Sequence, residues 1–246
     1  MRELDAVTIW IRENLREPLA DSPSLVIAMA AARLINRPET LEKLKSLILK
    51  HGWHKDCEAI MREVAAEGEP ITNGAYMITT PMGMDKAAGI SFILEMMKSD
   101  GDCENFISLN YMSQWLMKFP RVGTFIAAQI VADSKMVPRF RDCPDWNTFA
   151  LSGPGSRRGL NHVYGRPFDA PMEESEWHEK MLALRVELNK FLAGLGWDQV
   201  DAQDSQNCCC EAQKYFRMKN LGMEPKQIYR PKLEPAIKPT GQAQLF

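Results

Sequence analysis

Apolar residues recur every three or four positions along most of this chain, and this spacing constrains the fold more than any other feature. The apolar residues between Leu4 and Leu15 outline a first amphipathic helix. Ser22 and Pro23 then provide an N-cap and a first turn for a second, more apolar helix that continues to Leu34. The pattern predicts a mainly α protein.

Further helices follow from the same spacing and from residues that start or stop helices. We expect them over 38–52, 55–66, 86–98 and 105–117. The segment 74–83, GAYMITTPMG, is expected to be β-like or irregular, because Pro and Gly flank a short run of Tyr, Ile and Thr.

A chain of 246 residues, of which 45% are hydrophobic, can bury a full core. It contains no repeated block and no low-complexity linker, so we expect a single helical domain over residues 1–230. Residues 231–246 contain spaced prolines and are expected to form an extended or disordered tail.

Neither a membrane span nor a disulfide framework is expected. No apolar run approaches the roughly 20 residues that cross a bilayer, and the N-terminus is charged and amphipathic, so we expect a soluble, intracellular protein. The six cysteines include no CxxC pair and three in a row, a pattern that suits a reducing cytoplasm. We interpret Cys208–Cys210 as a partly buried helix surface and expect no iron–sulfur cluster.

The formal net charge of −2 does not by itself indicate DNA binding, but the charged residues are unevenly distributed along the chain. Residues 135–168 carry six basic and two acidic side chains, and residues 205–246 carry seven and three. The stretch between them, 169–204, carries nine acidic and three basic side chains. If the basic segments meet in space, they form a phosphate-facing surface backed by an acidic helix; solvated helix faces explain the same counts.

The stretch FPRVGTFIAAQIVAD, residues 119–133, places a Pro-x-Val-Gly turn between two predicted helices. Val122 and Gly123 lie in the turn, and the second helix opens at Thr124. This is the layout of a helix-hairpin-helix element, whose turn amides and following helix N-terminus hold a DNA phosphate. The same turn also joins helices that bind no DNA.

Asp145 follows the second hairpin helix and opens the segment DWNTFALSG. The region resembles the helix-hairpin-helix DNA glycosylases, which place a catalytic aspartate at the entrance of the helix after the hairpin. Asp145 is therefore the candidate for that place, ahead of Asp142. An N-cap for a short helix is the alternative role.

The segment SGPGSRRGLN, residues 152–161, combines glycines with two adjacent arginines. We interpret it as a phosphate contact, because glycines let backbone amides turn toward an anion and arginines offer forked donors. No Walker A lysine follows, so it is not an NTP-binding P-loop. The residues expected to take part are Gly153, Gly155, Ser156, Arg157 and Arg158.

A third stretch places Glu211, Lys214 and Tyr215 on one helix face, as an acid, a cation and a phenol, with Arg217 close by. A surface salt-bridge ladder explains the same spacing.

Taken together, these segments resemble the α-glutamyl/putrescinyl thymine pyrophosphorylase family of phage DNA-modification enzymes. That group includes amino acid:DNA transferases and the helical domain of 5-hydroxymethyluracil DNA kinases, and it is distantly related to helix-hairpin-helix glycosylases. The resemblance implies a helix-hairpin-helix, glycosylase-like helical bundle. The matching segments, which also bring in Arg33, Asn36 and Asp133, are 32–39, 74–76, 122–133, 145–146, 153–159 and 210–217.

The resemblance implies chemistry on a thymine whose methyl group carries a pyrophosphate. The enzyme would expel pyrophosphate and join an amino acid or polyamine to the methylene of a base flipped from double-stranded DNA. The glycine–arginine segment would stabilise the leaving group, Asp145 or Glu211 would accept the amine's proton, and Lys214 and Tyr215 would orient the reactants.

The chain lacks the Walker A motif of the family's kinase members, so we expect a stand-alone transferase acting in the cytoplasm of an infected bacterial host. We expect no cofactor and no dedicated metal site, although the sequence is compatible with a requirement for a divalent metal ion. A DNA base glycosylase and a non-catalytic DNA-binding module are the competing hypotheses. The first releases a base, and the second makes the carboxylates dispensable.

Overall fold

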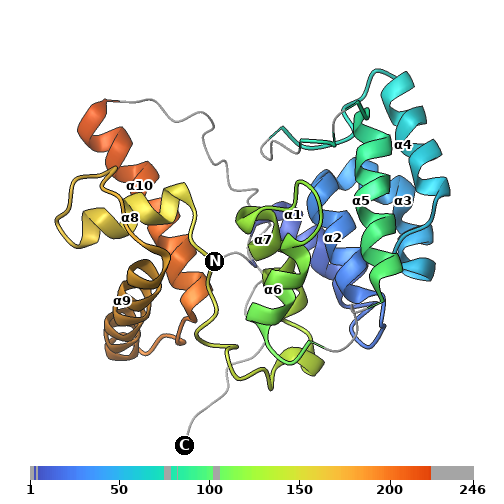
Figure 1. The fold of residues 1–246 in the computed structure, drawn as a ribbon. Helices are drawn as coiled ribbons and strands as arrows, with labels where there is room; N and C mark the ends of the chain where they lie inside the picture. The colour runs from blue at the N-terminus through green and yellow to red at the C-terminus, as the bar shows by residue number, and fades with distance from the viewer. Residues whose placement is uncertain (1–2, 4, 75–78, 82, 102–105, 223–246) are drawn as a thin grey trace, which may run out of the picture.

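The computed structural model describes residues 3, 5–74, 79–81, 83–101 and 106–222, and these residues form helices and connecting turns without a strand (Figure 1). The prediction of a mainly α fold is therefore confirmed for the described part of the chain. The α-helices are α1 (Ala6–Ile11), α2 (Leu25–Ile35), α3 (Pro38–His51), α4 (Asp56–Ala66), α5 (Lys86–Asp100), α6 (Leu109–Met117), α7 (Thr124–Ser134), α8 (Pro154–Val163), α9 (Glu174–Gly194) and α10 (Ala202–Leu221).

Helix boundaries agree with the sequence where a capping residue marks them. Pro38 occupies the first turn of α3, and Gly52 ends that helix with a φ of +69°, which favours glycine. The first predicted helix changes to a π-helical turn, η2 (Arg12–Arg16), after Ile11. The helix predicted from residue 105 begins later, at Leu109, because Ser108 is its N-cap and accepts a hydrogen bond from the amide of Tyr111.

The segment predicted to be β-like or irregular is irregular at residues 74, 79–81 and 83. Its other members, 75–78 and 82, lie outside the described residues, as does the predicted tail 231–246. None of the helices in the described ranges combines the length and apolarity that a bilayer crossing requires.

The larger of two apolar cores is built around α2. All eleven residues of this helix are buried, and it packs against α3, α5, α7 and η2. Such a helix has no solvent-facing stripe, so its sequence is apolar on every side. We call residues 5–149, which supply this core, the N-terminal lobe.

A second, separate core lies among α8, α9 and α10, and we call residues 150–222 the C-terminal lobe (Figure 1). Its seven buried apolar residues include Leu160, Trp177 and Met181. We expected a single helical domain over 1–230, and that boundary stays a prediction. Within the described chain, however, the buried apolar side chains fall into two clusters rather than one.

Close helix packing explains two glycines of the C-terminal lobe. A Cβ added at Gly159 would overlap the backbone carbonyl of Cys209 on α10, and one at Gly155 would lie 3.3 Å from Cys210 Sγ. Small residues four positions apart thus let α8 lie directly on α10. Gly155 and Gly159 are packing residues of this helix pair.

Burial also explains the run of cysteines on α10. Cys209 is buried, and Cys208 and Cys210 are half-buried, as the interpretation of a partly buried helix surface requires. Desolvation raises the pKa of the Cys209 thiol to about 12 and that of Cys210 to about 11. Burial thus favours the protonated thiol at both positions.

Polar contacts join the two lobes. Lys135, at the C-terminal end of α7, forms a buried ion pair with Asp201, the N-cap of α10, and its ammonium lies 4.4 Å from the centre of the Trp146 ring. The Gln203 side chain donates to the carbonyl of Ala128 at 2.9 Å. The ends of α7 and α10 are thereby fixed to each other.

Candidate functional site

The predicted hairpin is present between α6 and α7. Val122 is buried and anchors the turn in the N-terminal lobe, and Gly123 is the N-cap of α7. Thr124 and Phe125 in the first turn of α7 are exposed. Arg121 has a φ of +66°, a left-handed conformation that costs a non-glycine residue about 1–2 kcal/mol. The exposed Arg121 therefore occupies a strained position at the tip of the hairpin.

The first turn of α7 faces a cleft of about 550 Å³ at the border between the lobes. Thr124 lines it from the N-terminal lobe, and the other lining residues belong to the C-terminal lobe. From the predicted site the cleft gathers Thr124, Gly153, Arg157 and Arg158; its further lining residues are Ser152, Pro154, Asn161, Phe168, Asp169, Ala170, Pro171, Met172 and Glu174.

The glycine–arginine segment is a helix start, which corrects the expectation of a glycine-rich turn. Gly153 is the N-cap of α8, Pro154 is its first residue, and the rest of GPGSRRG is helical. Ser156 is buried, and its hydroxyl accepts a hydrogen bond from the Gly153 amide and donates one to the Gly153 carbonyl. The anion-attracting element is therefore the N-terminal end of a helix rather than a flexible loop.

The two adjacent arginines have different surroundings. Arg157 donates to Ser152 Oγ at 3.0 Å, to the Met172 carbonyl and to the Glu174 carboxylate, so it ties three places in the cleft wall together. Arg158 forms one ion pair, with Asp169 at 2.6 Å, and the Asp169 side chain is 74% exposed. Arg158 can exchange this solvated carboxylate for a ligand anion at little cost. Arg157 cannot do so without releasing the segment around Met172.

Acidic residues of segment 169–204 form ion pairs with arginines on and after α8. Glu174 pairs with Arg157, Asp169 with Arg158, and Glu176 with Arg166 at 2.6 Å. The charge counts left open a phosphate-facing surface backed by an acidic helix or ordinary solvated helix faces. In the structure, acidic side chains around the start of α9 pair with the arginines of α8 and of the turn that follows it.

The carboxylate of Asp145 is hydrogen-bonded to the start of another helix, α6. Its two carboxylate oxygens accept hydrogen bonds from the amides of Leu109 and Asn110, at 2.9 and 2.8 Å, in the first turn of α6. Residues 144–148 form turns, so Asp145 does not cap a short helix of its own, the alternative role considered above. It is also absent from the described residues that line the cleft. The structure therefore gives Asp145 a positioning role at the base of the hairpin.

Glu211, Lys214 and Tyr215 are exposed on α10. Glu211 and Lys214 form an ion pair at 2.6 Å, and the Tyr215 ring lies edge-on to Phe216. Arg217 is half-buried on the same helix. None of the four is among the described residues lining the cleft, so the arrangement matches the surface salt-bridge ladder.

The family-matching residues on α2 and α7 form a buried network in the N-terminal lobe. Arg33 donates to both oxygens of Asp133, at 2.5 and 2.9 Å, to Asn36 Oδ1 at 3.1 Å and to Thr8 Oγ1 at 2.9 Å. Asn36 ends α2 in the left-handed conformation, with a φ of +49°. This network ties α1 and α2 to the second hairpin helix, so these residues position the hairpin.

Sequence reasoning missed Asn161 and the wall formed by residues 168–174. Asn161 lies one helical turn beyond Arg157, so the i, i+4 spacing could have placed it on the same face. Asp169 and Glu174 carried no local signal, because their partners are on another element.

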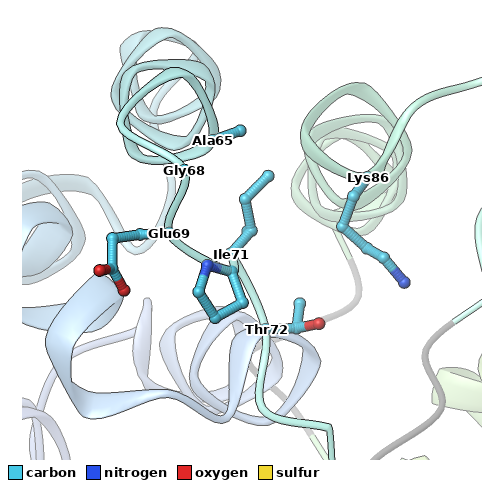
Figure 2. Close-up of a pocket in the computed structure, with 7 residues that line it drawn as sticks. Ala65, Gly68, Glu69, Ile71, Thr72 and Lys86 are labelled. Carbon is cyan, nitrogen blue, oxygen red and sulfur yellow. The ribbon is translucent and has the colours of Figure 1, made fainter.

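A second cleft, of about 450 Å³, lies between the C-terminal end of α4 and the start of α5 (Figure 2). Figure 2 shows Glu69 and Lys86 on opposite sides of it, with Ile71 and Thr72 between them. Glu69 already pairs with Arg37 at 2.6 Å, and no predicted site residue lines this cleft. The described chain holds no group of three or more metal-ligating side chains.

The fold and the cleft together describe a helical module with a hairpin and, beside it, a cleft lined by two arginines and the two carboxylates that pair with them. A family model for the helical domain of 5-hmdU DNA kinase matches residues 1–224, nearly the whole chain, so the protein belongs to this DNA-modification family. No curated protein and no solved structure matches the chain. The family relates the protein to thymine modification in phage DNA and supports an enzymatic role.

Proposed function

We propose that this protein is a DNA-modifying transferase of the α-glutamyl/putrescinyl thymine pyrophosphorylase type. Its substrates are double-stranded DNA carrying 5-pyrophosphoryloxymethyl-deoxyuridine and a free amino acid or polyamine, and it acts in the cytoplasm of a phage-infected bacterium. The amine nitrogen forms a bond to the exocyclic methylene, the carbon–oxygen bond breaks, and pyrophosphate leaves.

The observation that carries the proposal is the cleft. Pyrophosphate leaves with several negative charges, and such a group needs preorganised cationic and amide donors. The cleft brings together the N-terminal ends of α7 and α8, at Thr124 and Gly153, and the guanidinium of Arg158. Because the Gly153 amide is bonded to Ser156 Oγ, α8 contributes its helix dipole rather than this amide. Helix N-terminal ends and arginine are the two elements that proteins commonly use to bind phosphate.

The ion pair between Arg158 and Asp169 connects leaving-group binding to proton transfer. When pyrophosphate binds the guanidinium of Arg158, Asp169 loses its ion-pair partner and remains beside the reacting centre as an unpaired carboxylate. An ammonium nucleophile must lose a proton to attack, and Asp169 accepts it as general base. Asp169 replaces Asp145 and Glu211 in this role, because neither of those lines the cleft.

The experiment supplies the protein with duplex DNA containing pyrophosphorylated 5-hydroxymethyluracil and a mixture of amino acids and polyamines. Digestion to nucleosides and mass spectrometry then identify the product. An aminated thymidine with pyrophosphate released and the strand intact supports the proposal. A free base with an abasic site indicates a glycosylase, and DNA binding without turnover indicates a non-catalytic module; either outcome contradicts it.

Arg158→Gln sharpens the test, because it removes the exchangeable cation and leaves the wall intact. We expect turnover to fall about 100-fold and the melting temperature to stay close to wild type. Arg157→Gln should lower turnover and the melting temperature together, because it also releases the Met172 carbonyl and Glu174. Lys190→Gln, which removes one charge from an exposed pair on α9, is the control and should change neither.

Unchanged turnover and unchanged DNA binding in both arginine variants would contradict the role given to the cleft. The arginines would then be ordinary surface residues that hold α8 to the acidic segment.

A further inference from the structure

Asn161 is the most unusual polar residue in the cleft wall. Its side chain is almost fully buried, at 1% exposure, and it sits on α8 three residues after Arg158. Its Nδ2 donates to two backbone carbonyls, those of Phe168 at 3.2 Å and Ala170 at 2.9 Å. Both partners can only accept, so the amide orientation is fixed with the oxygen on the other side.

That oxygen, Asn161 Oδ1, accepts no hydrogen bond from the described residues. A buried acceptor without a donor costs about 1–3 kcal/mol, and such groups in native proteins call for an explanation. The residue lines the cleft, and its Nδ2 is bonded to the segment 168–170 of the same wall. A donor on a ligand that enters the cleft would satisfy the oxygen.

The surroundings favour a neutral, planar donor. Phe168, Pro171 and Met172 add apolar side chains to this wall, and the carboxylate of Asp169 is paired with Arg158. An ammonium buried against apolar side chains and one neutral oxygen would be costly to desolvate. The uncharged imide N–H of a uracil-type ring meets no such cost.

We propose that Asn161 is a specificity-determining residue, whose Oδ1 accepts the N3–H of a flipped uracil-type base while the group on its methylene lies against Arg158. The inference rests on the proposed function, because that function supplies the base and its charged substituent. It also predicts what the site rejects: a cytosine-type ring has an acceptor at N3, which would face the Asn161 oxygen without a proton between them.

The experiment compares two duplexes that carry pyrophosphorylated 5-hydroxymethyluracil opposite an abasic site, one with the natural N3–H and one with an N3-methyl group. The abasic site leaves both rings unpaired, so the cost of flipping is matched. For wild-type protein we expect turnover and binding of the N3–H duplex to exceed those of the N3-methyl duplex about tenfold or more. In Asn161→Leu the two duplexes should differ less than about twofold, because the acceptor is gone.

Equal use of both duplexes by the wild type would overturn the assignment, and so would an Asn161→Leu variant that keeps the full preference. If that variant does not fold, hydrogen–deuterium exchange on the unaltered protein decides. The N3–H duplex should slow exchange in peptides covering 159–172 more than the N3-methyl duplex does, and equal protection would overturn the proposal.

The two hypotheses fail in different ways. If the proposed transferase function is wrong, neither duplex yields aminated nucleoside. If only the role of Asn161 is wrong, both duplexes yield it, either at the same rate or with a preference that Asn161→Leu keeps.

Discussion

The two lobes hold their charged side chains in different environments. In the N-terminal lobe Arg33 and Asp133 are at most 2% exposed, and their ion pair lies inside an apolar core. In the C-terminal lobe Arg157 and Arg158 pair with carboxylates that are more than half exposed, beside a core of seven apolar residues. The first arrangement fixes the hairpin, and the second leaves charges that a ligand can rearrange.

The two lobes contribute different parts of the cleft. The N-terminal lobe supplies a rigid edge through Thr124, and the C-terminal lobe supplies the cations, the carboxylates and Asn161. Variants in the first lobe should therefore act mainly on stability, and variants at the cleft edge of the second should act mainly on ligand binding.

The largest effect is expected from Asp133→Ala. It leaves Arg33 charged and buried, and breaking a buried pair from one side typically costs 3–5 kcal/mol. Chemical denaturation followed by circular dichroism measures the free energy of unfolding. Glu211→Ala, which breaks an exposed pair on α10, is the control and should change it by less than about 1 kcal/mol. Similar losses in the two variants would contradict the contrast between the lobes.

Gly159→Ala should destabilise the C-terminal lobe by about 1–3 kcal/mol, because the new methyl group overlaps the Cys209 carbonyl and forces α8 away from α10. The measurements are the free energy of unfolding and the hydrogen exchange of each lobe. Gly194→Ala is the matched control, since nothing lies within 4 Å of the added carbon at the end of α9. We expect faster exchange in 154–163 and 202–221, with the N-terminal lobe unchanged. Equal loosening of both lobes would mean that they do not have separate cores.

Local signals were sufficient for most of the scaffold. Pro38, Gly52 and the Val122–Gly123 turn act on their own backbone, so the boundaries they mark could be predicted from sequence. The start of α6 could not, because Phe106 and Ile107 are apolar and fit the helical spacing although the backbone there is not helical.

The site was harder to predict, because the residues that contact one another there lie on different elements of the fold. Asp145 looks like a catalytic aspartate in the chain, but its oxygens are taken by the amides of α6. Arg157 and Arg158 are neighbours with equal propensities, and only the positions of Glu174 and Asp169 distinguish their roles. Spacing along α8 can place Asn161 near the arginines, but only the hydrogen bonds of its Nδ2 reveal the oxygen left without a donor.

Arg121→Gly tests whether the strained hairpin tip serves binding rather than stability. Glycine adopts the observed φ of +66° without a Cβ penalty, so the variant should be more stable by about 1 kcal/mol. Loss of an exposed cation should at the same time weaken DNA binding and reduce its salt dependence by about one charge. Thermal melting and a salt titration of DNA affinity measure the two effects. A variant that gains stability and binds DNA as tightly as wild type would show that Arg121 has no part in the interface.

The smallest effect is expected at the junction of the lobes, from Asp204→Asn. Burial, and then the neighbouring Asp201 carboxylate, raise the pKa of Asp204. The folded state therefore holds this proton more tightly than the unfolded state does. The resulting stability is fully present below the unfolded pKa of about 4, is lost as the pH rises through the folded pKa, and becomes a cost at neutral pH. Asp204→Asn should raise the melting temperature near neutral pH and leave it unchanged in acid. A gain that persists in acid would come from packing or from the helix N-terminus rather than from relief of a buried charge.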